Sequence, residues 1–152
     1  MRKITFYTMN TFLIALITLL FSCAAGLEEI VVEAYADGTP KVVRYYKGKG
    51  SEKTMIKEAY FYPDGAIRME GEFKNSKKDG RWISYYQDGK KWSEGYYKEG
   101  INEGKTITWH ETGEKYYQGS YSNGQRSGVW KFWDKDGVFL KEINYGKLQS
   151  GE

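Results

Sequence analysis

The sequence is poor in the side chains on which most metal and nucleophilic sites depend, with one cysteine and one histidine among its 152 residues. A single thiol cannot form an internal disulfide bond, and without a cluster of cysteine or histidine there is no conventional zinc site. The glycines open strands rather than helices, so no loop of the phosphate-cradling kind is present. We therefore expect no metal and no other cofactor.

The chain also lacks a strong charge of either sign. Its formal net charge is +3, and Arg2 and Lys3 lie in an N-terminal segment that we expect to be removed, which leaves +1. Because the two signs are interspersed, no basic stripe is available, and we expect no nucleic-acid partner. Only Leu27, Leu140 and Leu148 remain beyond that segment, too few for helices or a thick aliphatic core. Abundant aromatic residues and glycines favour a thin β-sheet instead.

The first residues have the order of a secretory signal. Arg2 and Lys3 precede Thr11–Phe21, an uncharged apolar run, and Ser22 is a small residue at the expected cleavage point. The run is shorter than the roughly 20 apolar residues needed to span a bilayer. We therefore expect residues 1–22 to direct export and not to form a transmembrane helix.

Cys23 stands directly after this signal. The segment Leu20–Cys23 resembles the bacterial lipobox, in which the cysteine thiol receives a diacylglycerol and becomes the mature N-terminus. The resemblance implies a lipid anchor on Cys23 and a location in the cell envelope. One acyl chain binds a protein to a membrane only marginally, whereas the several chains of a mature lipoprotein anchor it stably. Ala24, in place of the aspartate that retains lipoproteins in the inner membrane, favours the outer membrane. The alternative is an ordinary signal cut after Ala24, with an incidental thiol.

A period of 24 residues organises the rest of the chain. Glycines keep this period in columns that begin at Gly65, Gly71 and Gly80, and aromatic residues keep it in two further columns. The aromatic columns are Phe61, Tyr85, Trp109, Trp133 and Phe73, Tyr97, Tyr121, Tyr145, and a polar column is Glu70, Glu94, Gln118, Glu142. An earlier copy begins at Asp37-Gly38, and its extra residues enlarge the loop around Gly48–Gly50.

Each unit has the pattern of a β-hairpin. Arg81–Tyr86 precedes Asp88-Gly89 and Lys91–Tyr97 follows it, and Asp-Gly between aromatic runs is typical of a tight turn in which glycine takes a positive φ. The connection Lys98–Gly104 looks longer. The prediction is an all-β fold, an elongated single-layer antiparallel β-meander of tandem hairpins of about 24 residues, with about ten strands.

The period also sets the expected boundaries. Residues 1–22 are the signal peptide, 23–29 the lipidated N-terminus and a short tether, 30–146 the repeats, and 147–152 a C-terminal tail. The repeats are expected at 30–53, 54–77, 78–101, 102–125 and 126–146. A two-residue turn at Asp88-Gly89 pairs Trp82 with Gly95, Tyr85 with Trp92 and, one unit later, Trp109 with Tyr116; a bulged turn would shift these partners by one.

The pattern G-x-W-x-x-Y, then D-G, then G-x-Y-x-x-G resembles the MORN repeat. Gly80-Arg81-Trp82, Gly128-Val129-Trp130 and Gly95–Gly100 carry the match, and the similarity extends from about Gly65 to Tyr145. Thr106 replaces the expected tryptophan in one unit, and Ile143 replaces glycine in the last, which suits a terminal repeat. The variant is most similar to that of the bacterial YwqK-family antitoxins. This resemblance implies a protein-recognition module, with toxin neutralisation as one form of it.

Tyr85, Trp109 and Trp133 are the candidate partner-binding residues, because one ring per repeat would form a stripe able to stack on a partner. The competing interpretation is that these rings simply cover the sheet. His110 shares a column with Tyr86 and Asp134, so we interpret it as a polar strand residue and not as a catalytic or metal-binding one. No catalytic residue is predicted.

Two classes of function remain. The first is a non-catalytic, membrane-anchored module that recognises a protein in the cell envelope. The second is an envelope protein that binds or cleaves glycans through paired acids, since two carboxylates on a sheet resemble a glycosidase pair. The periodic placement of Glu70, Glu94, Gln118 and Glu142 favours a scaffold role, because one member of that column is an amide.

Overall fold

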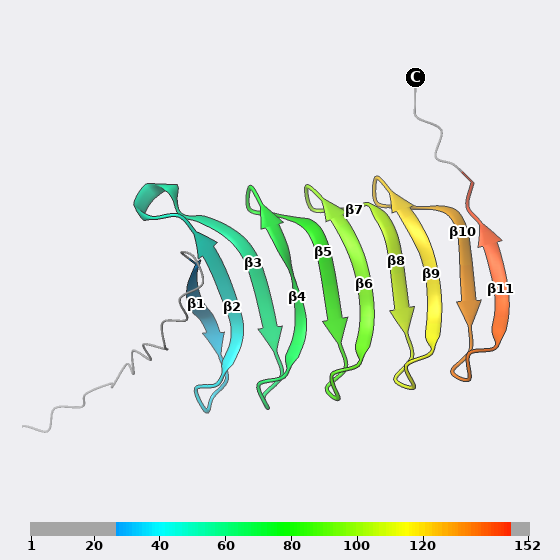
Figure 1. The fold of residues 1–152 in the computed structure, drawn as a ribbon, viewed down its shortest axis with the longest axis horizontal. Coiled ribbons are helices and arrows are strands. Elements are labelled where there is room, and N and C mark those ends of the chain that lie inside the picture. Colours follow the sequence, from blue (N-terminus) through cyan, green and yellow to red (C-terminus); the bar gives the residue numbers. More distant parts are fainter. Residues whose placement is uncertain (1–26, 147–152) are drawn as a thin grey trace, which may run out of the picture.

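The computed structural model describes residues 27–146 as one antiparallel sheet in which nearly every strand pairs with the next along the chain (Figure 1). Cys23, the predicted signal and the predicted tail lie outside the described residues. The strands are β1 (Leu27–Ala34), β2 (Pro40–Lys47), β3 (Thr54–Phe61), β4 (Ile67–Lys74), β5 (Lys77–Tyr85), β6 (Lys91–Lys98), β7 (Ile101–Asn102), β8 (Gly104–Trp109), β9 (Lys115–Ser122), β10 (Gln125–Trp133) and β11 (Phe139–Asn144).

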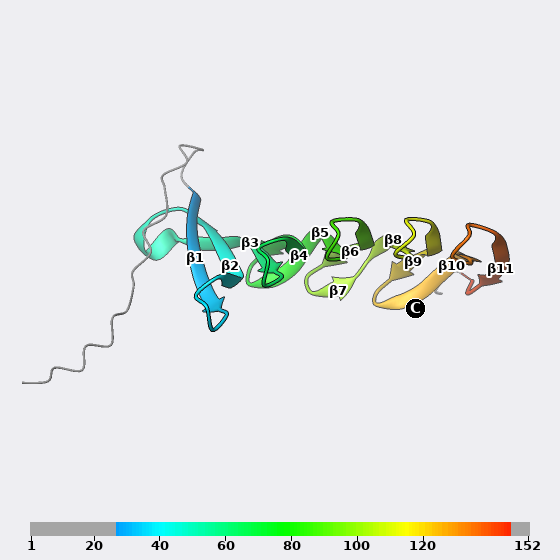
Figure 2. The same cartoon turned by 90° about the horizontal axis from the view of Figure 1, so that it is seen from below.

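The hairpins follow one another along the long axis of the molecule, and no second layer of described residues covers either face of the sheet (Figure 2). The predicted all-β, single-layer meander is therefore confirmed. The only helical segment in residues 27–146 is a three-residue 3-10 turn, η1 (Gly50–Glu52). It lies in the enlarged loop that the sequence predicts around Gly48–Gly50.

The sheet begins earlier than the sequence predicts. Leu27 pairs with Lys47 and Glu29 with Tyr45, so residues 27–29 belong to β1 and not to a tether. Nearly every residue of β1 is exposed. The sequence therefore has no alternation of apolar and polar residues to mark where this strand starts.

The turn at Asp88-Gly89 is not of the predicted two-residue, primed type. Gly89 donates its backbone N–H to the carbonyl oxygen of Tyr86 at 3.0 Å, and Tyr86 donates to the carbonyl oxygen of Lys90 at 2.8 Å. Within this loop only Gly89 has a positive φ, at 82°. This is a type I turn closed by a glycine bulge, in which the glycine is still required.

Primed turns lie instead at the other end of the hairpins. Glu99 and Gly100 both have positive φ, at 51° and 89°, as the central residues of a type I′ turn do. The predicted longer connection Lys98–Gly104 is thus a tight turn followed by β7 and an irregularity. Because β7 occupies part of β6, the direct pairing of β6 with β8 is limited to Ser93–Thr108 and Glu94–Ile107.

Each type I turn leaves one extra residue on the strand that follows it. Pairing across the β5–β6 hairpin includes Trp82 with Gly95, as predicted, but Tyr85 pairs with Lys91 and Trp92 is the extra residue. Trp109 likewise pairs with Lys115, which makes Tyr116 the extra residue of its unit. The predicted pairs Tyr85–Trp92 and Trp109–Tyr116 are therefore wrong, because the bulge shifts the partner by one.

The largest side chains of the core are two indole rings laid against glycines. Trp130 is completely buried and Trp82 is 4% exposed. A Cβ atom built on Gly71 would lie 2.1 Å from the Trp82 ring, and one built on Gly119 would lie 2.2 Å from the Trp130 ring. These two glycines are therefore required for the space that they leave, because close-packed interiors do not absorb such overlaps.

Each indole has the same surroundings. The Trp82 ring lies between Phe73 and Tyr97, at centroid distances of 5.5 and 6.1 Å, and the Lys78 ammonium lies 3.8 Å from the indole. The Trp82 Nε1–H donates to the carbonyl oxygen of Glu72 at 3.1 Å. Trp130 repeats this arrangement two units later, with Tyr121, Tyr145, Arg126 and the carbonyl oxygen of Ser120 in the corresponding places.

The primed turn at Asn75-Ser76 generates a prediction about stability. Ser76 has a φ of 61° and occupies the turn position that Gly124 occupies in a later turn. A residue with a Cβ in this left-handed region costs about 1–2 kcal/mol. We expect Ser76→Gly to raise the free energy of unfolding by about 1 kcal/mol, measured by urea denaturation. The reciprocal control, Gly124→Ser, should lower it by at least as much. A loss of stability in Ser76→Gly would contradict the turn assignment.

The glycines beneath the indoles generate a second prediction. We expect Gly119→Ala to lower the free energy of unfolding by roughly 3 kcal/mol, because the added methyl group overlaps the buried Trp130 ring. Gly95 occupies the equivalent position in the middle unit, where a Cβ would meet only the Thr106 Oγ1, at 3.6 Å. Gly95→Ala should therefore change the stability by less than about 0.5 kcal/mol. Equal losses in the two variants would show that the indoles do not set the requirement for glycine.

Candidate binding surface

One face of the sheet carries alternating aromatic and lysine side chains, named here the aromatic–lysine row: Tyr85, Lys91, Trp109, Lys115 and Trp133. The row crosses β5, β6, β8, β9 and β10, with Tyr85 paired to Lys91 and Trp109 paired to Lys115. The Lys91 Nζ lies 5.7 Å from the Trp109 ring centroid, and the Lys115 Nζ lies 5.5 Å from that of Trp133. The three predicted partner-binding residues thus share one row, with a lysine between each pair.

The two lysines of the row differ in their partners. The Lys91 Nζ lies 2.9 Å from the Glu94 Oε2, and that carboxylate neutralises its charge. The Lys115 Nζ donates to the amide oxygen of Gln118 at 3.0 Å, and no carboxylate of residues 27–146 forms an ion pair with it. The row therefore carries an unneutralised positive charge between Trp109 and Trp133. The sequence reasoning missed both lysines, although they are themselves 24 residues apart.

Side chains at the turns bond to the backbone carbonyl groups of this row. The Tyr62 hydroxyl donates to the carbonyl oxygen of Tyr85 at 2.8 Å, and the Tyr86 hydroxyl donates to that of Trp109 at 2.7 Å. His110 takes the same position in the next unit, where its Nε2 lies 3.1 Å from the carbonyl oxygen of Trp133. The carbonyl can only accept, so this bond requires the proton on Nε2. His110 thus has a scaffold contact, and the bonds fix one repeat to the next at each ring.

The polar column lies on the same face, and intervening strands separate its members. Glu70 and Glu94 flank Ile83, and Glu94 and Gln118 flank Ile107. Arg81 donates two hydrogen bonds to the Glu94 carboxylate, at 3.0 and 2.8 Å. These bonds and Lys91 lower the pKa of Glu94 to about 2. A general acid needs a raised pKa, so the lowered pKa of Glu94 does not suit the general acid of a glycosidase pair.

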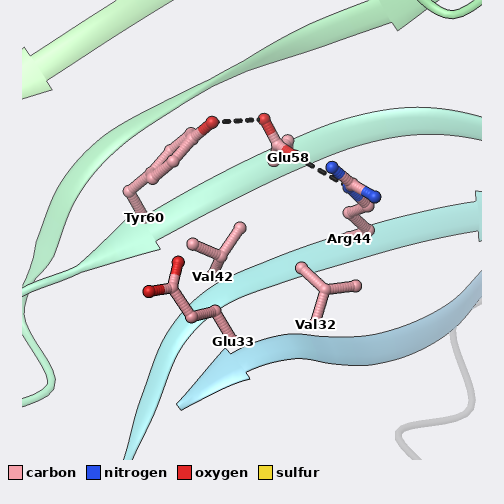
Figure 3. A pocket seen from close by; sticks show the side chains of 6 residues that line it. All are labelled: Val32, Glu33, Val42, Arg44, Glu58 and Tyr60. Carbon is pink, nitrogen blue, oxygen red and sulfur yellow. Dashed lines mark hydrogen bonds and ion pairs between the residues drawn. The ribbon is translucent and has the colours of Figure 1, made fainter. Parts of the chain in front are cut away.

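A shallow pocket at the N-terminal end of the sheet is lined by Val32, Glu33, Val42, Arg44, Glu58 and Tyr60 (Figure 3). The Glu58 side chain accepts hydrogen bonds from Arg44 Nε at 2.8 Å and from the Tyr60 hydroxyl at 2.6 Å. Burial, reinforced by the Glu58 carboxylate, raises the pKa of Tyr60 to about 12. Glu58 occupies the column of Trp82, 24 residues earlier. The buried Glu58, paired with the partly exposed Arg44, thus replaces the indole in this unit, and both hydrogen-bond donors to the carboxylate are residues of the sheet.

Residues 27–146 contain neither a candidate metal site nor a candidate membrane-spanning helix. No group of three or more histidine, cysteine, aspartate or glutamate side chains in this range is placed to hold a metal ion. No helix in the same range has the length and apolar character needed to cross a membrane.

Comparison with known proteins connects this geometry to a family. Residues 57–75 and 78–99 match the family described as the MORN repeat variant. The first match ends just after β4 and the second contains most of β5 and all of β6, so each corresponds to a hairpin of the sheet. No match to the chain was found among curated proteins. Two hairpins of the chain therefore match the MORN repeat variant, and the other hairpins share their 24-residue period.

Proposed function

We propose that the protein is a non-catalytic, lipid-anchored protein of the bacterial cell envelope, and that its hairpin repeats bind another envelope protein. The aromatic–lysine row is the observation that carries this proposal. Its rings are half-buried, whereas Trp82 and Trp130 are buried against glycines on the opposite face. The two largest buried rings therefore lie on the other face, and the rings of the row keep exposed surface for a partner.

The spacing of the row favours an extended polypeptide as the ligand. Successive rings are two strands apart, which corresponds to roughly 9.5 Å, and an extended chain covers that distance in about three residues. A partner segment in the polyproline II conformation, which has three residues per turn, would turn the same side toward each ring in succession. The unneutralised charge of Lys115 between two rings favours acidic side chains in that segment.

The sequence around Cys23 supports the proposed location in the cell envelope. If Cys23 carries lipid, only residues 24–26 separate it from the start of β1, and an extended chain of that length reaches about 14 Å. The first hairpin would then lie close to the bilayer, and the row would extend away from it along the sheet. The resemblance to YwqK-family antitoxins makes a toxin one candidate partner, and export would restrict such a toxin to the envelope.

Glycan cleavage receives less support than protein binding. Paired acids require one carboxyl group that stays protonated near neutral pH. The acid of the polar column with the clearest shift, Glu94, is instead held ionised by Arg81 and Lys91. The polar column supports a scaffold role in which its members orient the lysines of the row.

Lipidation of Cys23 is tested by metabolic labelling of the host with an alkyne fatty acid. We expect Cys23→Ala to lose the label and to accumulate as uncleaved precursor, because the thiol is the attachment point. The control Ser22→Ala keeps a small residue at the cleavage point and should remain labelled. An unlabelled wild-type chain that is nevertheless processed and released would favour the ordinary cleaved signal.

The row is tested by photo-crosslinking in intact cells. With p-benzoylphenylalanine in place of Trp109, we expect a single adduct of defined mass with an envelope protein. The further change Trp133→Ser should weaken the adduct at least tenfold, since aromatic anchors often contribute about 2 kcal/mol or more. The same photoreactive residue in place of Lys141, an exposed position over Phe132 on the opposite face, is the control. Equal adducts from both positions would contradict a specific role for the row.

A further inference from the structure

One indole is missing from the core. The tryptophan column contains Trp82 and Trp130, and Thr106 stands midway between them in the sequence. The side chain at this position covers a glycine on the preceding strand, Gly71 beneath Trp82 and Gly119 beneath Trp130. Both of these glycines are buried, whereas Gly95, the equivalent glycine in the middle unit, is half-exposed. The exposure of Gly95 shows that nothing in the described residues replaces the absent ring.

The remaining parts of the indole site are present in the middle unit. Tyr97 is held against Trp82 on one side, and Tyr121 is held against Trp130 on the other. No aromatic contact within residues 27–146 joins Tyr97 to Tyr121, so the two rings have not closed over the vacant position. We call the space over Gly95, between these two rings, the indole slot.

The side chain of Thr106 leaves the slot open. Its hydroxyl turns back to the neighbouring strand and donates to the carbonyl oxygen of Glu94 at 3.3 Å. A Cβ built on Gly95 would meet only the Thr106 Oγ1 within 4 Å. The cation that lies against the other indoles is also absent, because Asn102 occupies the place of Lys78 and Arg126 in the period. The middle unit has thus lost the ring and its cationic neighbour together.

The backbone also retains an acceptor for an indole N–H. Trp82 and Trp130 donate to the carbonyl oxygens of Glu72 and Ser120, each at 3.1 Å. The equivalent carbonyl in the middle unit belongs to Tyr96, which accepts one backbone bond from Glu103 at 2.9 Å. A carbonyl oxygen has two lone pairs, so Tyr96 has one acceptor position left for a donor in the slot.

We propose that the indole slot binds a tryptophan side chain of a partner polypeptide. Trp82 and Trp130 show what the same surroundings hold elsewhere in this sheet: a ring stacked over glycine between two aromatic rings, with its N–H on a backbone carbonyl. The N–H requirement selects indole over phenyl and aliphatic side chains, which lack that donor. The slot lies on the face opposite the aromatic–lysine row, so it is a second binding site.

The tryptophans of the chain itself do not supply the occupant. All five lie in residues 27–146: Trp82 and Trp130 are in the core, Trp109 and Trp133 are in the row on the other face, and Trp92 contacts Tyr86 at its bulge. Trp92 is 51% exposed. It is therefore the one tryptophan by which a second copy of the chain could compete for the slot.

The test uses the full chain labelled with ¹⁵N-glycine and titrated with N-acetyl-L-tryptophanamide. We expect a saturable shift of the Gly95 amide signal that is larger than the shifts of Gly71 and Gly119. N-acetyl-L-phenylalaninamide should bind more weakly, and N-acetyl-L-leucinamide should leave the Gly95 signal unchanged. An equal response to the tryptophan and leucine compounds would overturn the proposal.

Two variants block the slot in different ways. Gly95→Ala places a methyl group in it, and Thr106→Trp fills it with the ring that the other units have. Each should weaken binding of N-acetyl-L-tryptophanamide at least tenfold, as measured from the Tyr97 and Tyr121 backbone amides of the chain labelled with ¹⁵N-tyrosine, and Thr106→Trp should also raise the melting temperature. Lys105→Ala, on the neighbouring residue that faces away from the slot, should bind as the wild type does.

Several results would contradict the assignment. Undiminished binding of N-acetyl-L-tryptophanamide in Thr106→Trp would place the ligand elsewhere. A Gly95 shift that appears on concentrating the protein alone, and that disappears in Trp92→Ala, would identify a second copy as the occupant and overturn a partner polypeptide. The Trp133→Ser variant separates the two sites, because it should leave binding in the slot unaffected even where it weakens crosslinking through the row.

Discussion

The structure depends on the packing of an aromatic ring against a glycine in the adjacent strand. A single-layer sheet has no second layer against which to bury side chains, so its core must be made within the thickness of one set of rings. Trp82 over Gly71 and Trp130 over Gly119 meet this requirement, because the absence of a Cβ lets the indole lie directly on the backbone. The flanking tyrosines and phenylalanine then pack against the edges of the indoles, which is a favourable geometry for aromatic pairs.

This arrangement places the large core rings and the exposed rings on different faces of the sheet. Trp82 and Trp130 are buried on one face, and the opposite face carries the row from Tyr85 to Trp133 beside the smaller buried side chain of Ile83. Turn residues such as Tyr62 and Tyr86 bond to the backbone carbonyl groups of the row. These bonds fix a repeat to its neighbour at the end of the strands where the row lies, which suits a surface that presents one ring at a regular interval.

The period, the strand count and the hairpin order could be predicted from the sequence, because spaced glycines and aromatic residues mark strands and turns directly. The turn types could not. Glu99 adopts a positive φ that its residue type does not suggest, while Asp88-Gly89, the pair most typical of a primed turn, forms a type I turn with a bulge. The pairing error followed from that turn: Trp82–Gly95 lies before the bulge and was predicted correctly, and Tyr85–Trp92 lies after it.

The candidate site was predicted in part for a similar reason. The shared 24-residue column placed Tyr85, Trp109 and Trp133 in one row, since every second strand of the meander is equivalent. Lys91 and Lys115 belong to the strands between them, and only the register shows that these lysines enter the same row. The significance of Thr106 also needed the structure, because the sequence shows a replaced tryptophan without showing that the space remains.

The missing indole in the middle unit has a mechanical consequence. Strand β6 pairs with β7 and β8 through four residue pairs, but no ring packs over Gly95 where these strands meet. Packed rings stiffen a single-layer sheet, so the sheet should resist bending less at this point than in the units that contain Trp82 and Trp130. Tyr97 and Tyr121 lie on either side of this point, so a ligand held between the two rings would also restrict the bending of the sheet.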